Sequence, residues 1–243
     1  MRDLILDVIK HTQGLGIIDT VKVDGTDKET KFEAMESGKT VVLEATALKP
    51  EPKLKGEFGM GRLGILQGYF NFANYKTDAA KITVTHKDRD DKKDVPQEII
   101  FNDSKGQKSV YRFMSADMIP YAKFKGTSWD VTVSPDSSKI KELQELAGIL
   151  SGTEPYFLAK TSGGKLVFAI GEEGSDYAEI TIDSDVKGEL KGELYWPTNT
   201  VISILKLGAN ENPKIEITAR GALQITITSS QAEYKYILPA RKK

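Results

Sequence analysis

Residues 138–150 read SKIKELQELAGIL, and this stretch has the clearest helical pattern in the chain. Its apolar side chains recur at spacings of three and four residues, which predicts an amphipathic helix with one buried face. That face would comprise Ile140, Leu143, Ala147 and Leu150. Ser137 or Ser138 can cap the first turn, since a hydroxyl oxygen there accepts a backbone N–H bond.

Three other stretches have the same spacing, and they predict helices over residues 2–11, 59–72 and 197–207. Their apolar stripes are Leu4, Ile5, Val8 and Ile9; Leu63, Leu66 and Phe70; and Val201, Ile202 and Leu205. Gly64 and Gly68 weaken the second helix, because each glycine costs roughly 1 kcal/mol in a helix interior. Pro197 suits the first turn of the last helix.

Short runs bounded by turn residues lie between the helices, and each run predicts a strand. They are residues 19–24, 31–35, 40–47, 81–86, 97–102, 109–114, 156–160, 165–170, 177–182, 214–219, 223–228 and 233–238. Each helix is thus followed by three strands, and a further strand at Trp129–Val133 precedes the third helix. Hairpin turns are expected at Ser162-Gly163-Gly164, Gly221 and Ser229-Ser230.

The spacing of the helices indicates a tandem duplication. They start at residues 2, 59, 138 and 197, so the first and third are offset by 136 residues and the second and fourth by 138. Chance regularity in an α+β chain is the alternative. We expect an α+β fold with an N-terminal domain over 1–120, a connector over 121–127 and a C-terminal domain over 128–243. Each domain would pack two helices on antiparallel sheet.

The composition excludes several classes of site. The chain has 34 basic and 35 acidic residues among 243, so binding to nucleic acid requires that charge be segregated on one face. It has no cysteine, which excludes disulfides, thiolate metal sites and a cysteine nucleophile. No signal peptide and no membrane span is recognisable. We expect a cytoplasmic protein, in the cytoplasm of the host cell if the chain is viral.

Two glycine motifs resemble nucleotide-binding loops. Gly59-Met60-Gly61-Arg62-Leu63-Gly64 fits GxGxxG, but that chemistry needs a buried strand before it, and residues 53–57 are a poor one. Ser37-Gly38-Lys39-Thr40 fits only the end of a P-loop, because Glu33 stands where the first glycine is required. A hairpin turn is the better interpretation of the second motif.

The remaining polar clusters do not indicate catalysis. His11 and His86 have no local partner for a zinc site or a catalytic triad. The carboxylates of residues 86–94 alternate with Lys and Arg, which suits a solvated loop better than a cation site. Glu172-Glu173 lies between two glycines, in a turn. We expect no catalytic residue, no metal and no cofactor, and therefore not an enzyme.

The polar faces of the four helices are weakly basic. They carry Arg2, Lys10 and His11; Arg62 and Gln67; Lys139, Lys141 and Gln144; and Asn199, Ser203 and Lys206. Asp3 and Asp7 offset part of this charge. An ordinary solvated face explains any one of these residues, whereas a basic face repeated on four equivalent helices suits sequence-independent contact with phosphates.

Apolar residues crowd the predicted connector and the end of the chain. They are Met118, Ile119, Pro120, Tyr121 and Phe124, with Tyr234–Pro239 near the C-terminus. These residues either pack on their own sheet or border a groove for partner peptides.

The whole pattern resembles the DNA sliding clamps, the processivity factors of replicative DNA polymerases. The clamp of T-even-type bacteriophages is closest: Phe58–Leu66, especially Leu63-Gly64-Ile65-Leu66, is similar to its second helix, and Ile140–Leu146 to its third. The closing Tyr234–Pro239 also resembles proliferating cell nuclear antigen (PCNA).

The resemblance implies a head-to-tail homotrimer whose six domains form a ring around duplex DNA. Helices would line the hole, and sheets would join across subunits. The replicative polymerase and the clamp loader would dock through peptides, and the loader would supply ATP hydrolysis. By position, the DNA-facing residues would be Arg2, Lys10, Arg62, Lys139, Lys141 and Lys206. The partner pocket would comprise Pro120, Tyr121, Phe124, Tyr236, Leu238 and Pro239.

Two other functions compete with a clamp. The first is a non-enzymatic β-rich viral structural or assembly protein, in which the duplication serves subunit packing. Concentration of basic residues on the helices and of acidic residues on the strands would favour the clamp. The second is an enzyme that uses the GxGxxG motif.

Overall fold

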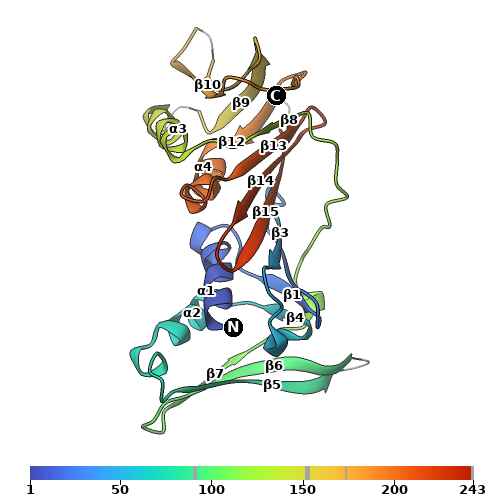
Figure 1. The fold of residues 1–243 in the computed structure, drawn as a ribbon, viewed down its shortest axis with the longest axis vertical. Helices are drawn as coiled ribbons and strands as arrows, with labels where there is room; N and C mark the ends of the chain where they lie inside the picture. Colours follow the sequence, from blue (N-terminus) through green and yellow to red (C-terminus); the bar gives the residue numbers. More distant parts are fainter. Residues whose placement is uncertain (90–91, 151–153, 173, 242–243) are drawn as a thin grey trace. The chain divides into compact units, whose positions relative to one another are not determined.

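The computed structural model describes residues 1–89, 92–150, 154–172 and 174–241, and it confirms an α+β fold with antiparallel sheets (Figure 1). The chain divides into two compact units. Unit 1 is Met1–Lys123 with Ser230–Glu233, and unit 2 is Phe124–Ser229 with Tyr234–Lys243. The main division thus falls after Lys123, inside the stretch predicted as a connector.

Unit 1 packs two helices with two antiparallel layers. Its elements are α1 (Arg2–Lys10), β1 (Val21–Gly25), β2 (Thr30–Met35), β3 (Val42–Ala47), β4 (Gly56–Met60), α2 (Leu63–Asn71), β5 (Lys81–Arg89), β6 (Lys92–Asn102) and β7 (Lys108–Arg112). The first layer has the order β4-β1-β2-β3, and the second has the order β5-β6-β7. Short 3-10 helices at Gln13–Leu15, Pro52–Leu54, Ala73–Tyr75 and Ala116–Met118 fill the connections.

Unit 2 repeats this plan. Its elements are β8 (Val131–Val133), α3 (Ser137–Leu150), β9 (Tyr156–Ser162), β10 (Lys165–Gly171), β11 (Tyr177–Asp183), β12 (Leu194–Pro197), α4 (Thr198–Leu207), β13 (Lys214–Thr218), β14 (Ala222–Thr228) and β15 (Ala232–Pro239). The first layer has the order β12-β9-β10-β11, and the second has the order β8-β13-β14-β15.

The two units also close in the same way. In unit 1, Gly59 of β4 and Met114, which lies just beyond β7, exchange backbone bonds of 2.9 and 2.7 Å. In unit 2, Tyr195 of β12 and Arg241, just beyond β15, exchange bonds of 3.1 and 2.9 Å. Chance regularity does not produce the same strand order and the same closing bridge twice. The chain is a duplication of one α+β plan.

The structure corrects the expected three strands per helix. A fourth strand, β4 or β12, stands directly before the second helix of each unit and pairs at the edge of the first layer. Sequence patterning missed both, because β4 contains two glycines and β12 has four residues and ends in proline. Because these strands occupy the residues before the helices, α2 begins at Leu63 rather than at residue 59. Pro197 likewise lies just before α4 rather than in its first turn.

The buried stripes of α1, α2 and α3 are confirmed residue for residue, and α4 buries Ile204 in addition to its predicted face. The predicted cap of α3 is wrong. Asp136 holds that position: its carboxylate accepts the Lys139 N–H at 2.8 Å and its carbonyl accepts the Ile140 N–H at 3.1 Å. None of the helices in the described part of the chain has the length and hydropathy that crossing a bilayer requires.

Two predicted turns are confirmed, and one predicted loop is wrong. Gly163 and Gly164 both have positive φ between β9 and β10, as a two-residue hairpin turn requires. Ser37–Thr40 turns between β2 and β3, where the Glu36 carboxylate accepts the Thr40 N–H at 3.2 Å. Residues 86–94, expected as a loop, instead extend β5 and β6 into a longer hairpin with irregular register; Asp90 and Asp91 lie outside the described residues.

Two glycines should respond oppositely to alanine. A Cβ at Gly25 would lie 1.9 Å from the Leu54 carbonyl oxygen, whereas a Cβ at Gly68 of α2 would meet nothing within 4 Å. We predict that Gly25→Ala lowers the free energy of unfolding by about 1–3 kcal/mol. Gly68→Ala should raise it by about 0.5–1 kcal/mol through helix propensity. Urea unfolding of both variants measures this, and equal effects would show that Leu54 does not constrain Gly25.

Candidate nucleic-acid and partner-binding surfaces

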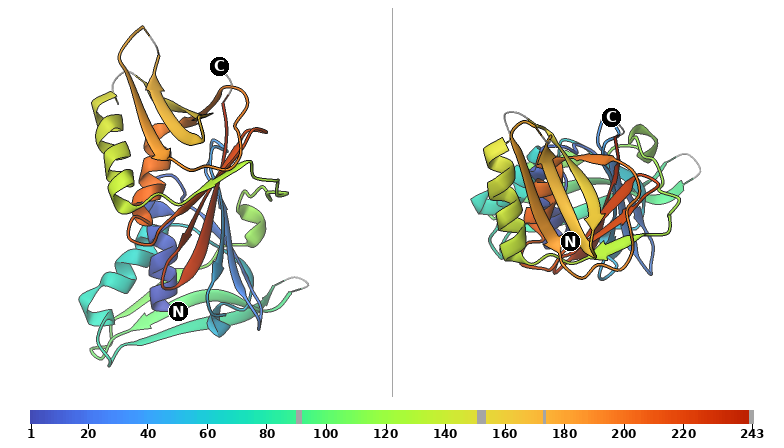
Figure 2. Two further views of the ribbon diagram at one scale, coloured as in Figure 1. Left: turned by 45° about the horizontal axis from the view of Figure 1, so that its top comes forward. Right: turned by 90° about the horizontal axis from the view of Figure 1, so that it is seen from above.

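The helices lie in pairs within each unit, α1 beside α2 and α3 beside α4 (Figure 2). In unit 1, the partly buried Arg2 joins the pair, because its Nη2 donates a 2.7 Å hydrogen bond to the carbonyl of Phe70 near the end of α2. The guanidinium therefore has a structural contact in addition to any contact with phosphate.

Among the candidate DNA-facing residues, two of the three cations without an ion pair or a side-chain hydrogen bond to the described residues lie on or directly before the second helix of a unit. Arg62 precedes α2 in the left-handed conformation (φ 49°), and Lys206 lies in the last turn of α4. Neither α2 nor α4 contains an acidic residue. Lys10 is also exposed, in the last turn of α1. These three side chains form no ion pair with the described residues, so they are available to an anion.

The cations of α3 are offset by their own helix. Lys139 pairs with Glu142 at 2.5 Å and Lys141 with Glu145 at 3.8 Å, at positions three and four residues apart. Such exposed pairs contribute little to stability, but they reduce the local positive charge.

Segregation of charge between helices and strands is modest. The four helices with Arg62 carry six basic and four acidic residues. The strands carry both signs, as where Lys22 of β1 lies 2.7 Å from Glu57 and 3.6 Å from Glu33. A phosphate-binding surface therefore rests on a few positions rather than on a broad positive field.

The six predicted pocket residues have different environments. Pro120 and Tyr121 belong to unit 1 and the other four to unit 2. The Tyr121 hydroxyl donates to Glu44 Oε1 at 2.8 Å, and burial together with that carboxylate raises the tyrosine pKa. Phe124 stacks on Trp129, with ring centroids 6.0 Å apart.

The last strand supplies two core residues rather than a surface. Tyr236 and Leu238 of β15 are fully buried, and the Leu238 carbonyl accepts the Trp196 indole N–H at 3.1 Å. Pro239, the final residue of β15, is exposed, as is Pro120. Pro120 and Pro239 are exposed and Tyr121 and Phe124 are partly exposed, whereas Tyr236 and Leu238 are fully buried.

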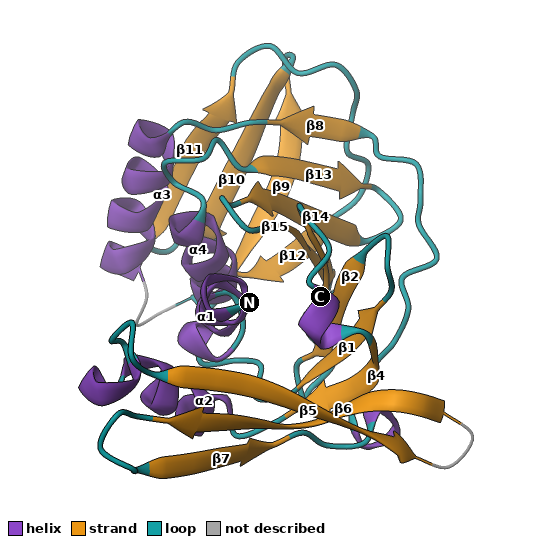
Figure 3. Cartoon of the chain, turned by 60° about the horizontal axis from the view of Figure 1, so that its bottom comes forward, coloured by secondary structure: helices purple, strands orange, loops and turns teal. Residues whose placement is uncertain are grey.

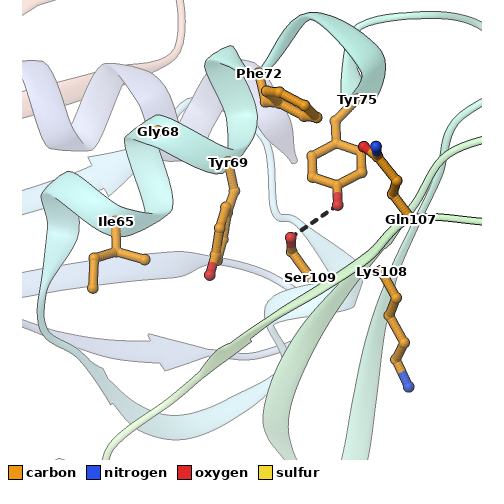
Figure 4. A pocket seen from close by; sticks show the side chains of 8 residues that line it. All are labelled: Ile65, Gly68, Tyr69, Phe72, Tyr75, Gln107, Lys108 and Ser109. Atoms are coloured by element: carbon orange, nitrogen blue, oxygen red, sulfur yellow. Dashed lines mark hydrogen bonds between the residues drawn. The ribbon is translucent and has the colours of Figure 1, made fainter.

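A cavity of about 450 Å³ that the sequence patterns did not predict opens between α2 and β7 (Figure 4). It is lined by Ile65, Gly68, Tyr69, Phe72, Tyr75, Gln107, Lys108 and Ser109. Tyr75 is held by a 2.8 Å hydrogen bond to Ser109 and by ring contacts with Phe72 and Phe101. The walls are therefore fixed, while Ile65 and Phe72 remain exposed.

The signal for this cavity is present in the sequence. Aromatic residues stand at positions 69, 70, 72 and 75, in the last turn of α2 and just beyond it. Only Phe70 belongs to the predicted stripe. The others exceed what one helix face can bury, and such an excess indicates an apolar surface.

The glycines of GxGxxG serve packing. Residues 53–55 lie in a 3-10 helix and its cap, as their poor strand pattern suggests, but β4 (Gly56–Met60) contains the first glycine of the motif. However, β4 is antiparallel to its neighbour β1, and a dinucleotide site requires a parallel crossover. A Cβ at Gly59 would lie 2.7 Å from the Ile119 side chain, and one at Gly61 would lie 2.4 Å from Met114 Sδ. These glycines admit the segment that leaves β7.

Acidic and histidine side chains do not gather into a metal site in the described part of the chain, where no group of three such residues is found. His11 is fully buried at the end of α1, out of reach of a substrate. His86 lies in β5, and Glu173 falls outside the described residues.

No protein-family model matches the sequence, and no curated protein matches it. Among solved structures, 367 chains match. One is the PCNA of A. fulgidus, solved with the C-terminal region of FEN-1 bound to it; the TM-score is 0.71 and the identity 7%. The match covers 99% of this chain and 96% of that chain. The chain has the fold of a DNA sliding clamp.

The coverage shows that the clamp fold takes in both units rather than one domain. An identity of 7% means that the two proteins share an architecture while most side chains differ. The clamp fold therefore explains the duplicated plan, and the surfaces must be judged from the residues of this chain.

Buried His11 makes stability depend on pH. Burial lowers its pKa from 6.5 to about 4, although Asp7 acts in the opposite direction. The unfolded chain takes up a proton between pH 6.5 and 4, whereas the folded chain does not. The contribution of neutral His11 to the free energy of unfolding is therefore fully present above about pH 6.5. It declines by up to about 3 kcal/mol as the pH falls towards 4.

We predict that His11→Gln reduces the loss of stability between pH 7.5 and 4.5, measured by urea unfolding at one protein concentration. The matched control is His86→Gln, in β5, which should retain the pH dependence of the original chain. An unchanged pH dependence in His11→Gln would contradict the assignment.

Proposed function

We propose that this chain is a sliding clamp: three copies form a ring that encircles duplex DNA and tethers the replicative DNA polymerase. The proposal rests on two complementary surfaces, one on unit 1 and one on unit 2, that have no partner in the described structure. They allow copies to join head to tail.

The first part of each surface is a sheet edge. Strand β7 of unit 1 and strand β11 of unit 2 each stand at the end of a layer, and an edge strand offers free backbone groups to another strand. Lys108 and Arg112 are exposed on β7, whereas Glu179 is exposed on β11 and Asp183 is partly exposed. Arg112 already lies 3.7 Å from Glu98, and Glu179 pairs with Lys160. The complementarity therefore rests mainly on Lys108 and Asp183. These opposite charges favour pairing of β7 with β11 of another copy.

The second part is apolar. The cavity between α2 and β7 exposes Ile65 and Phe72 in unit 1. In unit 2, Ile149 of α3 is 78% exposed, and α3 packs against β11. Each edge thus has an apolar partner beside it, a cavity on one unit and a protruding side chain on the other. Two different surfaces make a heterologous interface, which yields a ring when the rotation closes.

The best candidates to face DNA are Lys10, Arg62 and Lys206. Three further cations, Arg2, Lys139 and Lys141, are placed second, because each of these three already has a protein contact. Contacts of this kind hold phosphates without reading bases. A ring retains DNA by topology, so weak contacts suffice and still permit sliding.

Partners would dock as peptides. The PCNA of A. fulgidus was solved with a peptide region of a DNA-processing enzyme, FEN-1, and we propose that a polymerase and a clamp loader bind this chain similarly. Pro120, Tyr121, Phe124 and Pro239 are the first choices for contact. We propose no catalytic group on this chain, and the sequence resemblance favours a clamp of T-even-type phages, acting in the host cytoplasm.

One observation favours the other non-enzymatic function, a viral structural or assembly protein. The excess of basic residues on the helices is small, and open edges also serve subunits that pack without nucleic acid. Mass and retention on DNA separate the two functions.

Ile149→Asp should dissociate the assembly. We predict that the original chain sediments at three times its protomer mass of 26.8 kDa and that the variant sediments as a monomer at micromolar concentration. An unpaired charge buried at the interface accounts for the loss. The matched control is Leu48→Asp, an exposed leucine of unit 1 far from β7 in the sequence, which should remain trimeric. A monomeric original chain would contradict the proposal.

A closed ring should thread onto linear duplex DNA only through a free end. We predict that rings become trapped at 0.5 M salt when biotinylated ends are afterwards blocked with streptavidin, and that cutting the DNA internally releases them. Covalently closed circles should retain none without a loader.

Changing Lys10, Arg62 and Lys206 together to Glu should lower the trapped fraction by about tenfold at low salt. The matched control changes three exposed lysines outside the four α-helices, Lys53, Lys165 and Lys187, to Glu. Retention on closed circles, or equal losses in both triple variants, would exclude topological binding through the helices.

A further inference from the structure

The duplication allows the same sheet edge to be compared in the two units. Strand β5 of unit 1 and strand β13 of unit 2 are each the first strand after the second helix. On β5, Ile82 and Val84 stand opposite the fully buried Phe101 and Ile99 of β6, so they face the core. On β13, Ile215 and Ile217 stand in the same relation to β14.

In unit 2 a strand covers this edge. Strand β8 pairs antiparallel with β13 and places Val133 beside Ile215 and Val131 beside Ile217. All four side chains are at most 4% exposed. The two valines of β8 therefore complete the apolar layer, and they come from the segment that leads into α3.

In unit 1 the corresponding position is open. Strand β5 pairs only with β6 among the described residues, and it ends the β5-β6-β7 layer (Figure 3). None of the described residues pairs with the other edge of β5 in the way that β8 pairs with β13. Ile82 and Val84 remain partly exposed, although their partners on β6 are fully buried. The apolar layer is thus incomplete at one place.

A second difference marks the same edge. Thr218 follows Ile217 on β13, and its hydroxyl donates to Asp130 at 3.0 Å, just before β8. Thr85 follows Val84 on β5, and its Oγ1 is buried without a hydrogen-bond partner in the described part of the chain. A buried hydroxyl without a partner is unfavourable. In unit 2 the added strand supplies the acceptor.

We propose that the outer edge of β5, Lys81–Thr85, binds an extended segment of a partner protein as an additional antiparallel strand. The segment has the chemistry of Asp130-Val131-Thr132-Val133. It carries two β-branched apolar residues two positions apart, preceded by an acidic residue. The carboxylate of that residue would accept a hydrogen bond from the Thr85 hydroxyl after the Thr85 side chain rotates. Main-chain bonds provide affinity, and the two apolar positions provide specificity. The exposed Lys81 and Lys87 also favour an acidic partner.

This inference does not depend on the ring. Strands β5 and β7 stand at opposite ends of one three-stranded layer, so assembly through β7 leaves the β5 edge accessible. A monomeric chain would contradict the proposed function and leave this edge testable.

The probe is a synthetic peptide that copies Ser128–Pro135, added at about 1 mM to the full chain, with hydrogen exchange followed by mass spectrometry. We expect exchange of the Lys81–Thr85 amides to slow by at least about threefold. The control peptide carries lysine at both valine positions and should have no effect. Absence of protection, equal protection by both peptides, or protection located elsewhere would overturn the proposal.

A variant of the full chain tests the same position. Inserting Val-Thr-Val-Ser-Pro-Asp, the sequence of residues 131–136, between Met1 and Arg2 places a strand before α1 as β8 stands before α3. We expect this insertion to protect Lys81–Thr85 by itself and to abolish the effect of the peptide. Its matched control has lysine at both valine positions. Both insertions displace the terminal amine that pairs with Glu51 at 2.6 Å, so they share that loss.

A second copy of the chain is the competing occupant. In that case the Lys81–Thr85 amides would become protected as the protein concentration rises, without any peptide, and the valine insertion would lower the mass of the assembly. That result would overturn the proposal of a partner strand.

Discussion

Closure of each unit by a pair of backbone hydrogen bonds is the constraint on which the rest of the structure depends. The bonds between Gly59 and Met114, and between Tyr195 and Arg241, join the strand before the second helix to the chain that leaves the last strand. They require close approach of two main chains. In unit 1 that approach explains the glycine at position 59, where a side chain would collide with Ile119. The closure brings two layers around one core and leaves the outer edges of those layers as the surfaces that can act.

Under the proposed function, the edges and helix faces of this fold would carry the activity. Several polar groups of the described structure have structural contacts: Glu36 organises a turn, Tyr121 binds Glu44, and His11 is buried neutral. The free surfaces are β5, β7 and β11, the cavity beside α2 and the exposed cations. These surfaces are the ones on which the proposed clamp function depends.

The helices and the duplication could be predicted because a helix face repeats every three to four residues, and the stripes of α1, α2 and α3 are correct in full. Strands β4 and β12 could not be predicted, because edge strands this short and rich in glycine or proline have no periodic signal. The cap at Asp136 was missed because two serines beside it are equally good by type. The cavity was missed because it joins α2 to β7, and only the fold brings Tyr75 to Ser109. Tyr236 and Leu238 were assigned to a surface because composition does not distinguish an exposed strand from a buried one.

The exposure of Ile149 beside an unpaired strand edge affects the tendency of the newly made protein to aggregate. In the proposed ring, a protomer without its neighbours would present a bare apolar side chain and the unpaired edges of β7 and β11, which are features that promote aggregation. Rapid assembly would remove this hazard, so dilution and slow synthesis carry a risk of misfolded deposits. The charges on β7 and β11 then protect solubility as well as register, because they disfavour stacking of identical edges.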